Sequence, residues 1–185
     1  AIAVSGPFGA VKEQSSGLYA QTMAEFGFLT IAFDPSFTGE SGGSPRYVAS
    51  PDINTEDFCA AVDFLSVQEN VDSDRIGIIG RSAGGHLSAL AAMNSDLYES
   101  EEWSGYSSKV QACCDMFGPV DFLKLIEIDE HEIATNPNFR WKSMAETHAG
   151  ALMGGDPATF RERSKELCPP YILTKEMCRI LILHG

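Results

Sequence analysis

Residues 76–91 read IGIIGRSAGGHLSALA, and this stretch decides the fold that the sequence predicts. Its first residues, 76–79, are isoleucine and glycine and favour a short buried strand that ends at Gly80. From Ala83 onward, leucine and alanine recur at helical spacing, so a helix follows the strand almost at once. A strand that passes into a helix through a glycine-rich turn is typical of a parallel α/β sheet.

The turn between this strand and this helix has the pattern G-x-S-x-G, with Ser82 at its centre. A nucleophile raised on so tight a turn needs neighbours without side chains two residues before it and two residues after it. Gly80 and Gly84 stand at those positions, so we interpret them as the elbow of a nucleophile at Ser82. A helix beginning at Ala83 would turn its unpaired N–H groups toward an oxyanion, which makes the N–H of Ala83 the first candidate oxyanion donor.

Glycine-rich turns between a strand and a helix also bind phosphate or serve a purely structural role. A phosphate-binding loop requires Lys and then Ser or Thr after its last glycine, whereas Gly85 is followed by His86. A dinucleotide-binding turn requires G-x-G, and residues 80–82 read GRS. Phosphate binding is thus disfavoured, and a structural turn stays the alternative to a nucleophile.

A second oxyanion donor is expected in the loop after the strand that neighbours the nucleophile's strand. Residues 6–9 read GPFG and directly follow the first strand-like run, residues 1–5. Pro7 has no N–H, so the backbone N–H of Phe8 or of Gly9 is the candidate donor, with a plain turn as the alternative.

Strand-like apolar runs alternate with helical patterns along the whole chain. The strand-like runs lie at residues 1–5, 28–33, 76–79, 110–117 and 180–183. One helix is predicted from Ser16 to Gly27, and another begins at Asn54, which we expect to be its N-cap. This alternation predicts a three-layer α/β protein whose mostly parallel, doubly wound sheet has about five strands, each buried on both faces.

Residues 1–185 are expected to form a single domain, because roughly 100–200 residues per domain is usual. Residues 119–178 break into short helical pieces, and we interpret them as an irregular cap or substrate-pocket segment of that domain. The chain carries 13 basic and 26 acidic side chains, a formal net charge of −13. A polyanion would be repelled over most of such a surface, so no nucleic-acid partner is expected.

Other partners and cofactors are limited by the same composition. No apolar run approaches the ~20 residues that cross a bilayer, so no membrane association is expected. The five cysteines lack the spacing of metal ligands, so we expect neither a metal nor a cofactor. Free cysteines favour a reducing, cytoplasmic compartment, and secretion is the alternative because the first residue is Ala1 rather than Met.

Motifs in both halves of the chain resemble the α/β-hydrolase superfamily, esterase and lipase type. GPFG at residues 6–9 and GESGG at 39–43 are similar to dienelactone-hydrolase-type enzymes. SAGGHL at 82–87, FGPVDF at 117–122 and ILILHG at 180–185 are similar to carboxylesterases of the acetyl-xylan and feruloyl esterase type. The resemblance implies the α/β-hydrolase fold with a serine nucleophile at Ser82.

The resemblance also implies where the rest of a catalytic triad stands. In these families the chain order is serine, acid and histidine, and the acid and the histidine would follow Gly185. The opening strands of the family's sheet would likewise precede Ala1. We therefore expect the chain to be an interior portion of the fold, lacking the first strands and the last strand and helix.

Several groups within the chain are candidate substitutes for the acid and the histidine of the triad. The histidines are His86, His131, His148 and His184, none of which stands at the family's position. Asp115 and Asp121 flank the end of a predicted strand where an acid can stand, although Asp121 also fits the N-cap of a helix. Arg81 fits either a contact with a substrate carboxylate or a surface ion pair. Aromatic residues fit either a pocket or core packing, and they are Trp103, Tyr106, Phe139, Trp141 and Tyr171.

Residues and resemblance together predict a serine hydrolase that cleaves small carboxylic esters through an acyl-enzyme on Ser82. Its partner would be a small-molecule ester, and the oligomeric state stays open. The alternative is a catalytically incomplete or non-catalytic module of the same fold, because no acid and base stand at the family's positions.

Overall fold

The computed structural model describes residues 1–98, 105–153, 161–175 and 177–184. Its strands are β1 (Ile2–Ser5), β2 (Thr30–Ala32), β3 (Gly77–Arg81), β4 (Ala112–Met116) and β5 (Arg179–Leu183). Its longer helices are α1 (Ser15–Glu25), α2 (Pro51–Ser66), α3 (Ala83–Asn94) and α4 (Phe122–Thr135). Its shorter helices are η1 (Ser95–Leu97), η3 (Met144–Glu146), α5 (His148–Met153), α6 (Arg161–Glu166) and α7 (Pro169–Ile172).

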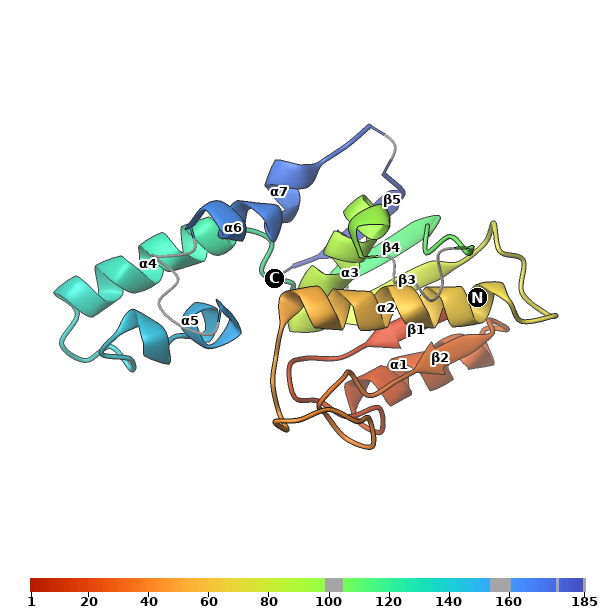
Figure 1. The fold of residues 1–185 in the computed structure, drawn as a ribbon, viewed down its shortest axis with the longest axis horizontal. Coiled ribbons are helices and arrows are strands. Elements are labelled where there is room, and N and C mark those ends of the chain that lie inside the picture. The colour runs from red at the N-terminus through yellow and green to blue at the C-terminus, as the bar shows by residue number, and fades with distance from the viewer. Residues whose placement is uncertain (99–104, 154–160, 176, 185) are drawn as a thin grey trace.

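The strands form one parallel sheet of five strands in the order β2-β1-β3-β4-β5 (Figure 1). β3, which leads into the G-x-S-x-G turn, is the central strand and lies between β1 and β4. Ser5 pairs with Gly80 across β1 and β3, so the loop after β1 begins beside the turn after β3. The predicted α/β class, with a parallel sheet of about five strands, is confirmed.

Helices cover both faces of the sheet, with α1 on one face and α2 and α3 on the other (Figure 1). Successive residues of β1 show the two faces, because side chains alternate along a strand. Ala3 packs with the helices α2 and α3, including Phe58 of α2. Ile2 and Val4 pack on the opposite face with Ala20 of α1. The three predicted layers follow from this alternation.

β5 differs from the expectation that every strand is buried on both faces. Leu181 and Ile182 are 57% and 58% exposed, and Leu183 is also exposed. Among the described strands, β5 is last in the sheet order and pairs with β4 alone. The expectation is therefore wrong for β5, because an apolar run predicts a strand but does not say which neighbours cover it.

Two boundaries also differ from the sequence-based expectation. α2 begins at Pro51 with Ser50 as its N-cap, so Asn54 lies inside the first turn and is not the cap. Proline suits the first helical position because the N–H that it lacks would have no acceptor there. The strand expected at 28–33 is reduced to β2, because three residues of this run pair with β1.

Helices α4 to α7 form a small unit beside the sheet, and α4 and α5 project away from the sheet (Figure 1). This unit has its own buried core, made by Phe122, Ile126, Ala149 and Cys168. The backbone N–H of Phe122 donates to Sγ of Cys168 at 3.1 Å, which joins the start of α4 to the start of α7. Where it is described, the segment 119–178 therefore consists mainly of packed helices.

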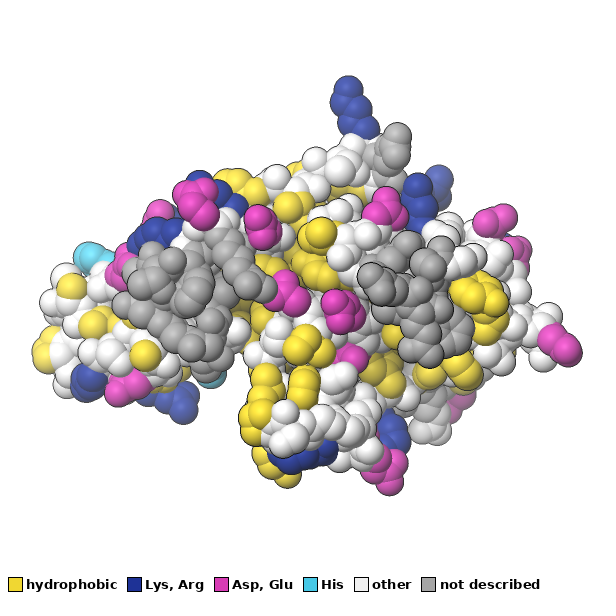
Figure 2. Space-filling model, in the orientation of Figure 1, with side chains coloured by type: hydrophobic (Ala, Val, Ile, Leu, Met, Phe, Trp, Pro, Cys, Tyr) yellow, Lys and Arg dark blue, Asp and Glu magenta, His cyan; other side chains and the backbone are white. Residues whose placement is uncertain are grey.

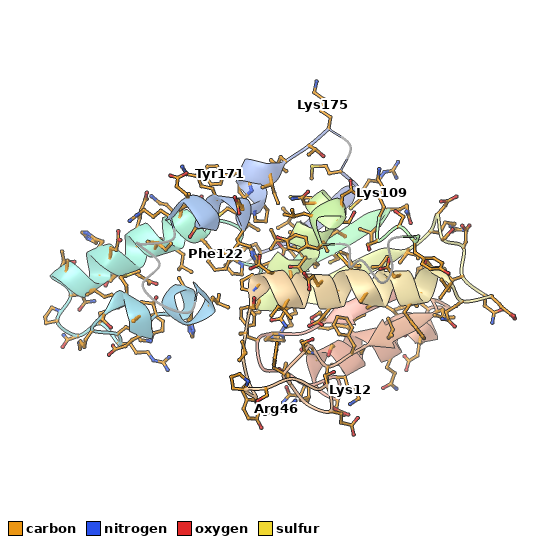
Figure 3. All side chains as sticks on the ribbon, viewed as in Figure 1. Lys12, Arg46, Lys109, Phe122, Tyr171 and Lys175 are labelled. Atoms are coloured by element: carbon orange, nitrogen blue, oxygen red, sulfur yellow. The ribbon has the colours of Figure 1, made fainter. Side chains whose placement is uncertain are left out.

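The loop between β2 and α2 is organised by the buried carboxylate of Asp34. This carboxylate accepts hydrogen bonds from N and Nζ of Lys12 at 2.7 and 2.9 Å, and from the N–H of Glu40 at 2.9 Å. Burial alone would raise the pKa of Asp34, but the hydrogen bonds from Glu40 and Lys12 outweigh it and hold the pKa below its usual value. Figure 3 shows Lys12 and Arg46 together in this loop region.

The surface carries charges of both signs, and Figure 2 shows acidic and basic side chains interspersed over the viewed face. Acidic side chains outnumber basic ones in the whole sequence, 26 to 13. In the parts of the chain that the structure describes, no helix has the length and apolar character needed to cross a membrane.

Candidate active site

Ser82 lies between the end of β3 and the start of α3, in an unusual backbone conformation. Its φ and ψ are 57° and −122°, a positive φ that residues with a side chain rarely adopt. The N–H of Ser82 donates to the carbonyl of Met116 at 2.7 Å, which ties the turn to the end of β4. Such a conformation costs on the order of 1–3 kcal/mol and persists only when the surroundings hold it.

Glycines at both sides of Ser82 make this conformation possible. A Cβ on Gly80 would overlap the carbonyl oxygen of Gly84, because the turn brings the two backbones together. A Cβ on Gly84 would lie 2.5 Å from the carbonyl oxygen of Gly6, in the loop after β1. Both positions therefore require glycine because another part of the backbone occupies the space of a side chain.

The backbone groups expected to act on an oxyanion lie around the same turn. α3 begins at Ala83, so the N–H of Ala83 belongs to the first helical turn, where N–H groups lack an intrahelical acceptor. The loop after β1 brings Phe8 to a cavity that Ser82 and Ala83 also line. Gly9, with φ 69°, does not line this cavity but a neighbouring hollow, which Phe8 and Arg81 also line. The structure thus brings Phe8 and Ala83 to one cavity with Ser82.

This cavity has a volume of about 530 Å³ and lies between the sheet edge and the projecting helices. One wall comes from α4 and α5, and Figure 3 shows Phe122 where α4 meets the body of the protein. Of the described residues that line it, none is Asp, Glu, Lys or Arg. Sequence reasoning missed several lining residues, namely Tyr47, Ala49, Phe122, Leu125 and Leu152. The sequence gives little indication that these residues line a cavity, because they share no motif and come from distant segments.

His86 is fully buried in α3 and does not line the cavity. Its ring packs edge-on against Phe122, with ring centroids 4.6 Å apart. Burial lowers the pKa of His86 to about 4, and the nearby carbonyl of Pro119 opposes this only in part. Neither ring nitrogen makes a well-formed hydrogen bond with the described residues. His86 is therefore a neutral packing residue and not a base for Ser82.

The other histidines lie in three different places. His131 is exposed on α4, and His184 follows β5 near the carboxylate of Asp115. His148, at the start of α5, lines the cavity together with Ser82. Within the described residues, no histidine is hydrogen-bonded to the hydroxyl of Ser82.

Asp115 and Asp121 have different surroundings. Asp121 is the N-cap of α4, and its carboxylate accepts from the N–H of Lys124 at 2.9 Å. Asp115 is buried in β4, and its Oδ1 accepts from the N–H of Gly118 at 2.8 Å. Its Oδ2 has no partner among the described residues, and burial raises the pKa of Asp115. Neither carboxylate is hydrogen-bonded to a histidine in the described structure.

The aromatic residues singled out by sequence do not gather at the cavity. Phe139 and Trp141 pack on each other in the turn after α4, while Tyr106 and Tyr171 are exposed elsewhere. Trp103 lies outside the described residues. The aromatic side chains at the cavity are instead Phe8, Tyr47 and Phe122. Of the two alternatives, a pocket at this cavity is therefore not formed by the described members of the set.

Arg81 is exposed beside the turn, and no ion pair involves it among the described residues. In the same part of the chain, no cluster of three or more His, Cys, Asp or Glu side chains has the arrangement of a metal site. The described candidate site therefore consists of a serine, backbone donors and an apolar cavity.

A parallel sheet, a strand–serine–helix turn at its carboxyl edge and an adjoining apolar cavity together define an α/β-hydrolase-type protein. Residues 11–185 match the model of the BD-FAE family, and the chain belongs to this family of α/β-hydrolase-type esterases. The resemblance inferred from the sequence motifs is confirmed at this level.

The chain is similar to curated proteins over about half of its length. Protein PA2218 of Pseudomonas aeruginosa is 70% identical over 91 residues, which are 49% of this chain and 24% of that protein. Thiohydrolase aneE of Aspergillus aculeatus is 36% identical over 92 residues, which are 50% of this chain and 29% of that protein. The matched part of the chain thus spans less than a third of each of these relatives.

Solved structures share the fold over the whole chain. The truncated form of a carbohydrate esterase from gut microbiota is 24% identical and has a TM-score of 0.73. The match covers 100% of this chain and 66% of that chain. This likeness shows the fold, and the family match supports a hydrolase of the esterase type.

Proposed function

We propose that Ser82 is the nucleophile of an ester hydrolase and forms an acyl-enzyme. The observation that carries this proposal is the backbone of Ser82, with φ 57° and ψ −122°, between β3 and α3. Gly80 and Gly84 leave the space that this conformation needs. A strained conformation that its surroundings enforce is common where a side chain must be presented for chemistry.

The proposed reaction follows from the groups around the turn. Oγ of Ser82 attacks the ester carbonyl carbon and passes its proton to a general base, which later protonates the leaving alcohol. The N–H of Ala83, with that of Phe8 or Gly9, stabilises the oxyanion of the tetrahedral intermediate. Water then hydrolyses the acyl-enzyme and restores the hydroxyl of Ser82. We propose that the base and its acid partner lie in the whole protein beyond these 185 residues.

The proposed substrate is a small carboxylic ester with an uncharged, mainly apolar group. The cavity beside Ser82 supports this choice because its described lining has no Asp, Glu, Lys or Arg. A thioester is a second candidate, because a relative of this chain is named a thiohydrolase. Both substrates lead to the same acyl-enzyme on Ser82 and differ in the leaving group.

A fluorophosphonate probe tests the nucleophile directly, because it forms a stable adduct with an activated serine. Because the proposed base lies beyond these 185 residues, we expect slow labelling that reaches one adduct per chain by intact mass, and none on Ser82→Ala. Ser73→Ala, which removes an exposed serine outside the site, is the matched control and should keep the adduct. Absence of an adduct on the folded protein would favour the non-catalytic module, and an adduct retained by Ser82→Ala would contradict the proposal.

Turnover of p-nitrophenyl acetate tests where the base lies. Loss of a triad member leaves only about 10³–10⁴ of rate enhancement over water, so we expect the chain of 185 residues to hydrolyse this ester weakly. Fast turnover that Ser82→Ala abolishes would show that a base lies within the chain after all.

A further inference from the structure

The cavity beside Ser82 has one imidazole in an otherwise mainly apolar lining. His148 lines the cavity from the start of α5, whereas Phe122, Leu125 and Leu152 make the apolar part of the same wall. No Asp, Glu, Lys or Arg side chain lines the cavity among the described residues. A polar group at such a place restricts what an apolar pocket accepts, because an unpaired polar atom is costly once buried.

The ring of His148 is held by its neighbours. Its centroid lies 4.9 Å from that of Trp141, in an edge-to-face arrangement at 77°. Trp141 is itself supported by Phe139, at 5.5 Å between ring centroids, and by the guanidinium of Arg140 above its ring. The imidazole therefore has a packed side against Trp141 and another side that faces the cavity.

A buried carboxylate lies close to the same imidazole. Asp129 of α4 is 4% exposed, and burial raises its pKa. The charge of His148 and a hydrogen bond with Thr147 act in the opposite direction on the pKa of Asp129. The effect of His148 on the pKa of Asp129 places the two side chains near each other, between α4 and the start of α5.

We infer that His148 is a specificity-determining residue that donates a hydrogen bond to an oxygen acceptor on the group bound in this cavity. The group is uncharged and mainly apolar, and its carbonyl, ether or hydroxyl oxygen lies away from the ester that is cleaved. The inference rests on the proposed function, because it takes the cavity to be the binding site of the ester that Ser82 attacks. His148 is exposed in the structure, so the bound group must cover its ring. Discrimination then arises because the covered donor stays unpaired when the acceptor is missing.

Binding of two matched esters tests this inference without turnover. The protein carries Ser82→Ala to prevent hydrolysis and Trp103→Phe, so that Trp141 is the remaining tryptophan of two in the sequence. Emission of Trp141 then reports the affinity for methyl hexanoate and for methyl 5-oxohexanoate, which adds a distal carbonyl. We expect His148→Phe to lower the preference for the oxo ester about tenfold, the effect of one lost hydrogen bond.

Two further variants separate hydrogen bonding from packing. His148→Gln keeps an N–H donor and should retain most of the preference for the oxo ester. His131→Phe, on the exposed face of α4, should leave the preference unchanged. Equal effects of His148→Phe on both esters would overturn the inference and indicate a structural role. Failure of both esters to bind would also overturn it, whereas failure of the proposed nucleophile would be seen separately as a missing phosphonate adduct.

Discussion

At the scale of single residues, the candidate site depends on close contact between backbones. The loop after β1, the turn at Ser82 and the start of α3 approach each other where Gly80 and Gly84 have no side chain. The same closeness holds Ser82 in its positive-φ conformation. Changes at these glycines therefore act on both stability and the geometry of the serine.

Replacing Gly80 by alanine should destabilise the protein. The new Cβ would overlap the carbonyl oxygen of Gly84, so the turn must shift, at a cost of about 1–3 kcal/mol or more. Urea unfolding measures the loss. Gly42→Ala is the matched control, because a Cβ there meets nothing within 4 Å, and it should change stability by less than about 1 kcal/mol. Equal stability of the two variants would contradict this account of the elbow.

His86 should make stability depend on pH between about 6.5 and 4. Burial lowers its pKa from 6.5 to about 4 in the folded protein, so the unfolded chain binds more protons within this range. The contribution of His86 to the free energy of unfolding is therefore complete above pH 6.5. It is lost as the pH falls, by roughly 3 kcal/mol at pH 4. Urea unfolding at pH 7 and pH 4.5 should show a smaller loss for His86→Leu than for the unmodified chain.

The matched control for removing a histidine is His131→Leu, because His131 is exposed on α4. Each of the two variants replaces one histidine by leucine, and they differ in whether the replaced histidine is buried. An unchanged pH dependence in His86→Leu would mean that the buried imidazole does not set the loss of stability.

At the scale of elements, caps and strand pairs decide where each helix and strand begins. Pro51 starts α2, and Asp121 caps α4 through the N–H of Lys124. The start of α4 also matters for the cavity, because Phe122 and Leu125 line it from the first turns of that helix. An altered cap would therefore affect both the helix and the cavity wall.

Asp121→Ala should destabilise the protein by about 1 kcal/mol, the usual cost of a lost N-cap. The carboxylate that accepts from Lys124 N at 2.9 Å is removed, and that N–H loses its acceptor. Chemical denaturation followed by circular dichroism measures the change. Asp121→Asn keeps an accepting oxygen and should lose only a few tenths of a kcal/mol. Equal losses in both variants would show that charge rather than capping stabilises α4.

At the scale of the whole molecule, the sheet brings distant segments together at one edge. Apolar side chains of β5 remain exposed. Ser82 comes from the middle of the chain, Phe8 from its beginning and His148 from its last third, and all three line one cavity. On the far side of β4, Leu181 and its neighbours in β5 remain exposed. An exposed apolar edge strand can pair with another chain.

Self-association should therefore decrease in Leu181→Lys. A charge on the edge strand opposes edge-to-edge pairing, so association should begin at a protein concentration at least severalfold higher. Light scattering over a concentration series measures this onset. Leu173→Lys is the matched control, because Leu173 is 56% exposed and Leu181 57%, but Leu173 lies outside the sheet. The same onset in both variants would mean that β5 does not mediate association.

The sequence by itself determined the features that depend on neighbours along the chain. The α/β class follows from alternating strand-like and helical runs, and the turn at Ser82 follows from glycines two residues away on each side. Asp121 was recognised as a possible cap for the same reason. These predictions succeed because backbone sterics, hydrogen bonding to adjacent residues and side-chain periodicity act over a few residues.

Only the tertiary structure decided which distant residues meet. The cavity lining by Tyr47 and Leu152, the burial of His86 against Phe122 and the exposure of Leu181 depend on how the sheet and the helices pack. The sequence does not distinguish an apolar side chain that enters a core from one that lines a cavity or stays exposed. Burial is a property of the three-dimensional neighbourhood, so the pattern along the chain does not determine it.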